Sequence, residues 1–369
     1  MNQRHLFLFL PLFLLTGCWD QTPLQKEAMI MAASIDKVKK DSILSTVAIR
    51  GSEQMMGGQT RPINTIISET GHNLKETRLK VNKITVGEYS SNKLRVILLG
   101  EELAKDSIVP YIDSYLRDPK LTLSAKVAVV KGKASKIIKE KTYQHKLIGE
   151  ALAKELETME KNSVIPIENQ QTIRNKISDE GKDLVLPYIE KKSDNTIGVT
   201  GVALFHGDRF TGATLKNYEP ELLILLLGKK KEDSRMTVKY RNGENMKDFL
   251  SFNVHRFKRK MKINLRDGKP QVVLNTKMMI EINDYSGKSL QDKKELDKFN
   301  QNLSYIIEKD MNNVVYKLQN ANCDALGIGR KLIAYHPDTW KKMKWNEEYP
   351  KIPITVHLEV KTINRGIIY

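Results

Sequence analysis

Of the two cysteines in the sequence, Cys18 is the one placed where a thiol can take part in chemistry. It follows a short apolar run, Leu6 to Leu15, and the two small residues Thr16 and Gly17. Its thiol is the one nucleophile of this segment that can form a thioether with a diacylglyceryl group. Two acyl chains give stable membrane anchoring, which a single chain does not. The expected chemistry is therefore lipid attachment at Cys18.

The start of the chain has the parts of a secretory signal. Arg4 gives a basic start, an apolar run of about ten residues follows, and small residues precede the cleavage site. As a helix the run reaches about 15 Å, roughly half of a bilayer core, so it is too short for a stable transmembrane anchor. Leu15-Thr16-Gly17-Cys18 resembles the lipoprotein box. We expect removal of residues 1–17, and the alternative is an ordinary signal peptide with a chance cysteine at its edge.

Outside the N-terminal segment, the sequence contains no motif in which His, Cys, Ser or Gly residues have the spacing of a known catalytic or metal-binding site. The histidines form no HExxH or HxH pair, and CxxC, GxSxG and GxxxxGK[ST] are missing from the sequence. Gly327-Ile328-Gly329 follows an expected helix rather than a strand, and Leu332 stands where a dinucleotide loop has its third glycine. The better interpretation is a turn between helices in which glycine permits a positive φ. We predict no catalytic residue, no metal site and no cofactor, and hence no enzyme.

Composition limits the class of protein further. The length of 369 residues favours two or three domains. If Cys18 carries lipid, Cys323 has no disulfide partner and is expected to be a small buried residue. The net charge of +17 favours anionic surfaces. Because export argues against nucleic acid, we expect lipid headgroups to meet the clusters Lys229 to Lys231 and Arg256 to Lys260, although a solvated charged face is the alternative for each.

The N-terminal half alternates strands with helices. Residues 94–99 are predicted to form a buried strand, residues 109–116 a helix and residues 121–130 another strand, and the chain becomes helical again from residue 135. A polar stretch, Glu190 to Thr196, is the best candidate for a domain boundary. Alternating elements of this kind favour a mixed sheet with packed helices.

The C-terminal half has the clearest periodicity. Apolar residues alternate from Phe257, turn at Asp267-Gly268, and alternate again to Ile282, which predicts a long hairpin. Residues 296–318 carry one apolar stripe at helical spacing, and residues 352–360 alternate as a last strand. We expect a β-β-α-β unit in which the helix lies across an antiparallel sheet.

These elements define the expected organisation. The fold class is α+β, with mixed and antiparallel sheets and packed helices in more than one domain. After the signal peptide of residues 1–17, we predict an N-terminal mixed α/β domain at 18–192 and a C-terminal domain at 196–369. The second domain is either one unit or is divided into a middle part at 196–232 and the β-β-α-β part at 235–369.

Several stretches, taken in order, resemble the C-subunit lipoproteins of spore germination receptors, the GerAC-like or Ger(x)C family. The matching stretches are Gly17-Cys18-Trp19-Asp20, Leu94 to Ala104, Leu116-Arg117-Asp118-Pro119, Gly201 to Phe205 with Gly207-Asp208, Leu226-Leu227-Gly228, and Asp324 to Gly329 with His336-Pro337 and Trp340. Two places depart from the family pattern. Ala325 stands where we expect proline, and Met55 to Thr60 does not align.

The resemblance implies a non-enzymatic subunit of a nutrient germinant receptor, needed for spore germination. Its partners would be two integral-membrane subunits, of A and B type, and the lipid on Cys18 would hold it on the outer face of the spore inner membrane. One alternative is a solute-binding lipoprotein that captures a small nutrient in a cleft. Another is an exported hydrolase acting on wall material, which would need paired carboxylates or a metal cluster.

Overall fold

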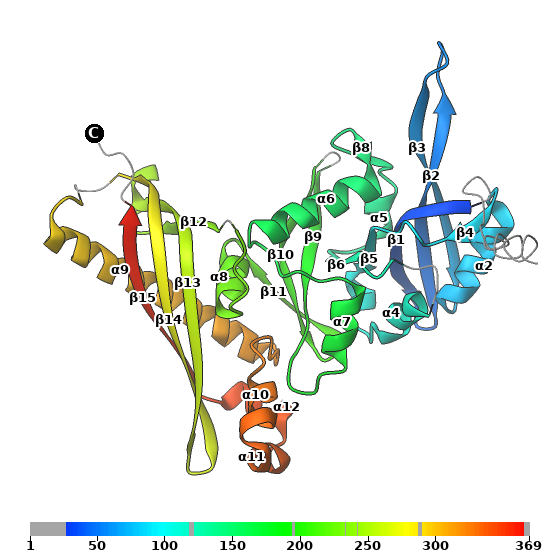
Figure 1. Cartoon of the computed structure of the whole chain (residues 1–369). Coiled ribbons are helices and arrows are strands. Elements are labelled where there is room, and N and C mark those ends of the chain that lie inside the picture. The colour runs from blue at the N-terminus through cyan, green and yellow to red at the C-terminus, as the bar shows by residue number, and fades with distance from the viewer. Residues whose placement is uncertain are drawn as a thin grey trace, which may run out of the picture.

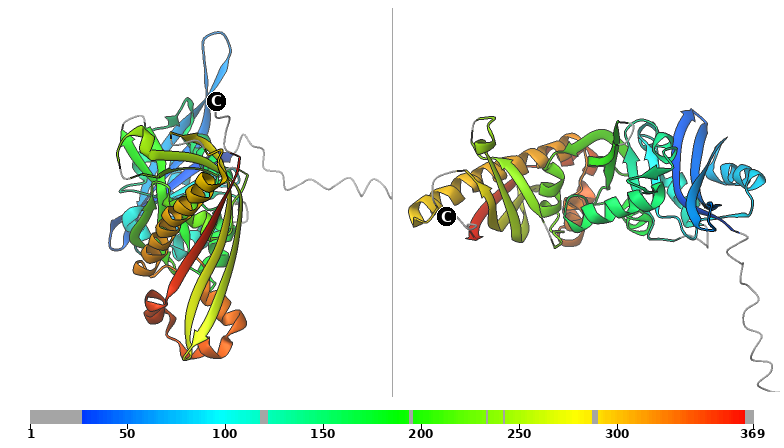
Figure 2. Two further views of the ribbon diagram at one scale, coloured as in Figure 1. Left: turned by 90° about the vertical axis from the view of Figure 1, so that its left-hand side faces the viewer. Right: turned by 90° about the horizontal axis from the view of Figure 1, so that it is seen from above.

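The computed structural model describes residues 27–117, 122–193, 196–232, 234–241, 243–286 and 290–364. The predicted signal peptide, Cys18 and the pair Asp118-Pro119 lie outside the described residues. The described chain forms two lobes that lie next to each other, a large lobe built mostly from the N-terminal half and a small lobe built from the C-terminal half (Figure 1). Seen from above, the lobes form an elongated row (Figure 2).

A nine-stranded mixed sheet forms the large lobe, in the order β11-β10-β9-β6-β5-β1-β2-β3, with β4 paired to β1. Its strands are β1 (Glu27–Lys39), β2 (Ser42–Gln54), β3 (Thr60–Gly71), β4 (Glu88–Ser90), β5 (Val96–Gly100), β6 (Lys126–Val130), β9 (Val185–Ser193), β10 (Thr196–His206) and β11 (Arg209–Lys216). The central strands β1, β5, β6 and β9 are parallel, and antiparallel strands flank them. The buried strand expected at 94–99 is β5, the middle of this parallel part.

Helices cover both faces of the large sheet. They are α2 (Leu74–Ile84), α3 (Glu101–Ala104), α4 (Val109–Leu116), α5 (Ser135–Ile138), α6 (Ile148–Lys161) and α7 (Gln170–Ile177), with a small hairpin of β7 (Thr142–Tyr143) and β8 (Lys146–Leu147) before α6. Alternate residues of β5 enter two different cores: Val96 and Leu98 pack with α5 and α6, and Ile97 and Leu99 pack with α2 and α4. A strand buried on both faces explains why its sequence is apolar at every position.

The hairpin of β10 and β11 extends the large sheet past the predicted boundary between residues 192 and 196. β10 pairs with β9 from Thr196 to Leu204. β10 and β11 are joined by a tight turn at Gly207 and Asp208 and pair antiparallel with each other. The division into domains at 18–192 and 196–369 stays a prediction, and the two strands on either side of this boundary, β9 and β10, are neighbours in one sheet.

The small lobe contains a four-stranded sheet in the order β12-β13-β14-β15. Its strands are β12 (Arg235–Lys239), β13 (Phe249–Arg266), β14 (Lys269–Tyr285) and β15 (Ile354–Asn364), and its long helix is α9 (Lys293–Asn320). Asp267 and Gly268 turn the β13–β14 hairpin with positive φ angles of 50° and 74°. In Figure 1, α9 passes behind β13, β14 and β15 and leaves the near face of the sheet uncovered.

The expected β-β-α-β unit is present, with one correction. β15 runs parallel to β14, not antiparallel as the order of elements suggested. The reason is that α9 carries the chain back along the sheet, so the next strand starts from the same end as β14, as in other crossover connections. The fold class of α+β with mixed and antiparallel sheets agrees with this arrangement.

Short helices connect the lobes. They are α8 (Glu219–Leu226), α10 (Ile328–Tyr335), α11 (Pro337–Lys342) and α12 (Trp345–Glu348), with 3-10 turns at η3 (Met246–Asp248) and η4 (Tyr349–Lys351). One apolar core runs from α5 and α6 through α8 to α9 and the small sheet. Across the described ranges, none of the helices is both long and apolar enough to cross a membrane.

Candidate functional site

The predicted lipid attachment at Cys18 lies outside the described residues and stays a prediction. The structure begins with Glu27, the first residue of β1. Two other regions gather charged side chains from stretches that the sequence singled out. One is a buried junction between the lobes, and the other is the uncovered face of the small sheet.

The junction is centred on Asp183, which stands just before β9. Its carboxylate accepts hydrogen bonds from the backbone N–H of Asp324 at 2.6 Å and from that of Gly207 at 2.7 Å. The backbone N–H of Asp183 donates to the carbonyl oxygen of Asp324 at 3.0 Å. One side chain therefore ties the large sheet, the β10–β11 turn and the segment after α9 together. Sequence reasoning missed Asp183, because no local pattern marks it.

Asp324, completely buried beside Asp183, caps the start of α10. Its two carboxylate oxygens accept the backbone N–H groups of Ile328 at 2.9 Å and Gly329 at 2.7 Å. Burial raises the pKa of the Asp324 carboxyl to about 8, while the two N–H donors act in the opposite direction.

Two glycines allow the backbones of the two lobes to meet at the junction. A Cβ atom on Gly181 would lie 2.2 Å from the backbone nitrogen of Arg330, whose N–H donates to the Gly181 carbonyl oxygen at 2.8 Å. A Cβ atom on Gly329 would lie 3.0 Å from the rings of Trp340 and Trp345. Gly327 has a φ of 70°, as the interpretation of a glycine turn between helices requires.

Aromatic rings close the junction on the side of the small lobe. Trp340 and Trp345 have ring centroids 5.2 Å apart, and Trp345 and Tyr349 have centroids 5.4 Å apart. The Tyr349 hydroxyl donates to the carbonyl oxygen of Cys323 at 2.9 Å. Cys323 is itself fully buried, and burial raises the pKa of its thiol well above the ordinary value. A buried neutral thiol of this kind is a packing residue.

The junction has the geometry of a structural joint. Its carboxylates are saturated with backbone donors, and its glycines and aromatic rings fill the space around them. Within the part of the chain that the structure describes, no group of three His, Cys, Asp or Glu side chains could hold a metal ion. The arrangement fixes one relative position of the lobes.

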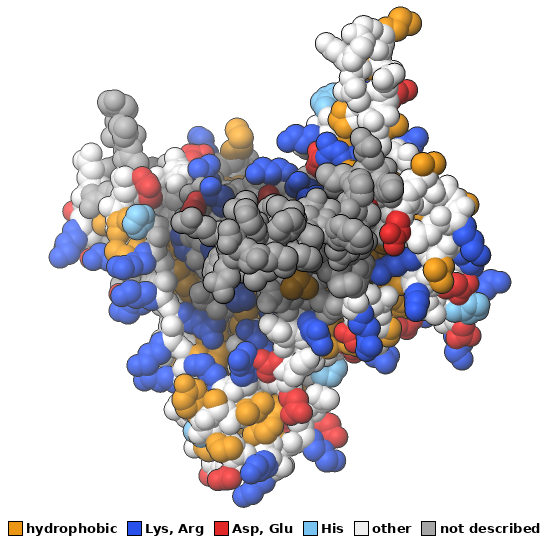
Figure 3. Space-filling model, turned by 45° about the vertical axis from the view of Figure 1, so that its right-hand side comes forward, with side chains coloured by type: hydrophobic (Ala, Val, Ile, Leu, Met, Phe, Trp, Pro, Cys, Tyr) orange, Lys and Arg blue, Asp and Glu red, His pale blue; other side chains and the backbone are white. Residues whose placement is uncertain are grey.

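The second region is the face of the small sheet that α9 does not cover, here called the cationic face. It presents exposed lysine and arginine side chains from all four strands. These are Arg235, Lys239, Arg256, Lys258, Lys260, Lys262, Lys277 and Lys361. Its acidic side chains include Asp284, which lies opposite Ser251, Glu281, which accepts a hydrogen bond from the Asn364 amide, and Glu359, which pairs with Lys277 at 2.6 Å. Lys and Arg side chains crowd the left-hand part of the surface in Figure 3.

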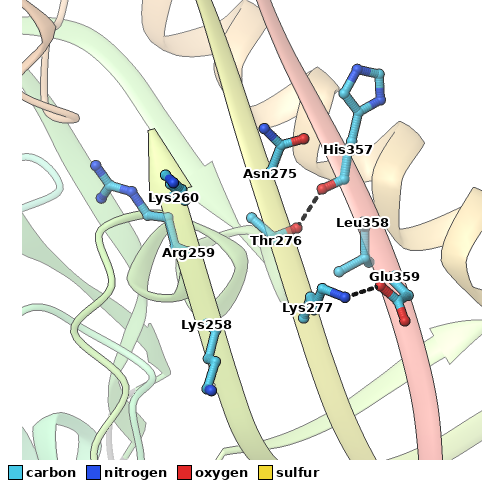
Figure 4. Close-up of a pocket in the computed structure, with 9 residues that line it drawn as sticks. All are labelled: Lys258, Arg259, Lys260, Asn275, Thr276, Lys277, His357, Leu358 and Glu359. Carbon is cyan, nitrogen blue, oxygen red and sulfur yellow. Dashed lines mark hydrogen bonds and ion pairs between the residues drawn. The ribbon is translucent and has the colours of Figure 1, made fainter. Parts of the chain in front are cut away.

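The middle of the cationic face is hollowed. Figure 4 shows the side chains around this hollow of about 540 Å³, which include Lys258, Lys260 and Lys277 from the two central strands. Thr276 donates to the His357 carbonyl oxygen at 2.7 Å across the neighbouring strand. The floor of the hollow is therefore hydrogen-bonded sheet, and its wall is a set of ammonium groups.

The predicted cluster Arg256 to Lys260 divides between the two faces of the sheet. Arg256, Lys258 and Lys260 point outward, whereas Arg259 turns inward and donates to the carbonyl oxygen of Leu226 at the end of α8. Burial lowers the pKa of Arg259. In the other cluster, the Lys230 ammonium donates to the carbonyl oxygens of Lys231 and Glu232, so it stabilises its own loop.

Comparison with known proteins gives two family models in the order of the chain. The model described as spore germination protein N-terminal domain matches residues 20–191. The model described as spore germination B3/GerAC like, C-terminal, matches residues 200–366.

Individual relatives match over their whole length. Spore germination protein GerQC of Bacillus cereus is 24% identical over 368 residues, which are 100% of this chain and 99% of that protein. Spore germination protein KC of Bacillus subtilis (strain 168) is 25% identical over 391 residues, covering 98% of this chain and 95% of that protein. The crystal structure of the GerBC protein has a TM-score of 0.60 and 18% identity, over 90% of this chain and 97% of that one, and so has the same fold.

The two family matches follow each other along the chain and together cover most of it. The chain belongs to the GerAC-like family of spore germination proteins and carries both of the family's domains in order.

Proposed function

We propose that the chain is the membrane-anchored C-subunit of a nutrient germinant receptor and is needed for spore germination. The observation that carries this proposal is the match of both family domains, in order, across residues 20–366. The proposed partners are two integral-membrane receptor subunits of A and B type. The proposed location is the outer face of the spore inner membrane.

Lipid on Cys18 would give the anchor, and the residues before β1 would give the tether. From Cys18 to Glu27 the chain has about nine residues, which span about 30 Å when fully extended. A tether of this length keeps the body at high effective concentration beside partners in the same membrane. Because the junction fixes the lobes to each other, a partner that binds one lobe would also set the position of the other.

Germination of spores that lack the chain tests the proposal. Single nutrients would be compared with a trigger that bypasses the receptors, in the deletion strain and in strains with Cys18→Ala or, as a matched control, Cys323→Ala. We expect loss of the response to some nutrients, with the bypass intact. Cys18→Ala should reproduce the loss, and Cys323→Ala should leave the response close to normal.

Two results would contradict parts of this proposal. A normal response of the Cys18→Ala strain would remove the anchor from the mechanism. Capture of a small nutrient by the isolated chain would favour the solute-binding alternative, in which the chain senses the nutrient itself.

A further inference from the structure

The cationic face carries charge that the protein does not use for its own fold. Among the residues that the structure describes, Lys258, Lys260 and Lys262 make no ion pair. They are exposed and alternate along one strand, so the Cα atoms of neighbouring lysines on this face are about 7 Å apart. Lys258 also lies opposite Lys277 in the register of β13 and β14. Like charges placed opposite each other destabilise a sheet, and the ion pair of Lys277 with Glu359 offsets only part of this cost, because Lys258 has no anionic partner of its own among the described residues.

The opposite side of the small lobe lacks this excess. Along α9, lysines and acids are interspersed: Lys293, Lys294, Lys298, Lys309 and Lys317 stand with Glu295, Asp297, Glu308 and Asp310, of which Glu308 accepts the backbone N–H of Leu358 in β15. A net charge that was spread only for solubility would cover both sides of the lobe equally. The charge on this lobe is instead concentrated on the face that no helix covers.

The start of the described chain lies on the same side of the molecule as the cationic face. In Figure 1 the dark-blue start of β1 lies on the near side, and the uncovered face of the small sheet is also turned to the viewer; the view from above in Figure 2 agrees. A tether from Cys18 to Glu27 reaches about 30 Å at full extension. An anchored chain is therefore able to lay the cationic face against the membrane that holds its lipid.

We propose that the cationic face docks on the anionic phospholipid headgroups of that membrane. The lysines of β13 face the phosphates, and the hollow between β13 and β15 takes headgroups between Lys258, Lys260 and Lys277. The inference rests on the proposed lipid anchor, because the anchor brings the face within reach. Docking would give the anchored chain one fixed orientation, with α9 and the far side of the small lobe away from the bilayer.

Energy transfer on vesicles tests this orientation in the full lipidated chain. A donor dye is placed on Thr355→Cys, an exposed position on the cationic face, and the acceptor is placed on the lipid headgroups. Cys323 is buried and Cys18 is acylated, so the dye reacts at the new thiol. Vesicles contain equal parts of phosphatidylglycerol and phosphatidylcholine, or phosphatidylcholine alone.

We expect at least about twofold higher transfer on the anionic vesicles, and loss of this difference as salt shortens the screening length from about 10 Å toward 3 Å. The difference in transfer between the two kinds of vesicle should disappear in a triple variant with Lys258→Glu, Lys260→Glu and Lys262→Glu. The matching triple variant with Gln should reduce it. The control, Lys293→Glu, Lys294→Glu and Lys309→Glu on α9, changes the net charge equally and should keep it.

Equal transfer on both kinds of vesicle would overturn the proposal. If the Glu triple variant of β13 then also lost germination, an acidic protein partner would replace lipid as the occupant of the face. Flotation with vesicles tests the anchor separately. A chain that does not float with vesicles lacks the anchor. A chain that floats, but shows equal energy transfer on anionic and neutral vesicles, has an anchor but no docking face.

Discussion

The junction and the cationic face use charged side chains in opposite ways. At the junction, Asp183 and Asp324 are enclosed, and backbone N–H groups from separate segments point at their oxygens. On the cationic face, Lys258 and Lys260 are exposed, and the described residues offer them no anion. The comparison teaches that a buried acid with backbone partners specifies how this chain folds, while an exposed and unbalanced charge is available for something outside it.

This difference predicts the size of the effect of each substitution. A buried group that loses its partner costs about 1–3 kcal/mol or more, because water cannot replace the partner. Exposed ion pairs contribute about 0–1 kcal/mol. Substitutions at the junction should therefore change stability, and substitutions on the cationic face should change association.

Gly181→Ala is expected to have the largest effect. Its Cβ atom would lie 2.2 Å from the backbone nitrogen of Arg330, and backbone cannot move aside as a flexible side chain does. We expect a loss of about 3 kcal/mol in the free energy of unfolding, measured with urea. Gly198→Ala is the matched control, since a Cβ atom there would meet only Glu155 Oε1 at 3.9 Å. Equal stability of the two variants would contradict the role of the close approach.

Asp183→Ala comes next. It removes the acceptor of the Asp324 and Gly207 N–H groups, and of these the Asp324 group is buried. We expect a loss of about 2–3 kcal/mol in the free energy of unfolding. Asp179→Ala is the control. Because its partner Arg330 has a largely solvent-exposed side chain, this variant should lose under about 1 kcal/mol in the free energy of unfolding. If both variants lose the same amount, Asp183 is not the centre of the joint.

The pH dependence of stability tests whether burial or the N–H donors have the larger effect on the pKa of Asp324. The folded-state pKa of about 8 lies above the ordinary value near 4, so the folded state holds the proton more tightly than the unfolded state. The contribution of Asp324 to the free energy of unfolding is at its maximum below about pH 4 and is lost as the pH rises toward 8. Asp324→Asn does not titrate and isolates the contribution. The stability of the wild type relative to this variant should fall by a few kcal/mol between about pH 5 and pH 8 in urea unfolding.

The opposite slope would be equally informative. If the wild type gains on the Asn variant as the pH rises, the N–H groups of Ile328 and Gly329 hold the Asp324 carboxylate ionised, and its pKa lies below the ordinary value. The junction would then resemble a helix cap more than a buried acid.

The sequence predicts the local elements of this fold better than their long-range pairing. The β13–β14 hairpin and α9 follow from residue alternation and helical spacing, which act over a few residues. The parallel pairing of β15 with β14, and the extension of the large sheet by β10 and β11, are set by which distant strands meet. Local periodicity carries no information about that choice, so the antiparallel interpretation of the small sheet was right for β12, β13 and β14 and wrong for β15.

The same reasoning separates the residues of the two regions. The turn at Gly327 was found from the sequence, because a glycine-rich turn after a helix is a local signal. Asp183 and Gly181 were missed, since their roles exist only when the two lobes meet. The basic cluster at 256–260 was visible in the sequence, but the alternation of a strand was needed to see that Arg259 turns inward while its neighbours face outward.

Neutralising the cationic face should have the smallest effect on folding. Lys258→Gln, Lys260→Gln and Lys262→Gln together remove three exposed charges that make no ion pair within the described chain. We expect the free energy of unfolding to change by less than about 0.5 kcal/mol, or to rise slightly because repulsion between Lys258 and Lys277 is relieved. Urea unfolding at low and high salt checks this, and the gain should vanish at high salt. A loss above about 1.5 kcal/mol would mean that these lysines hold the sheet together, which would remove the contrast with the junction and the reason for assigning the face to an external partner.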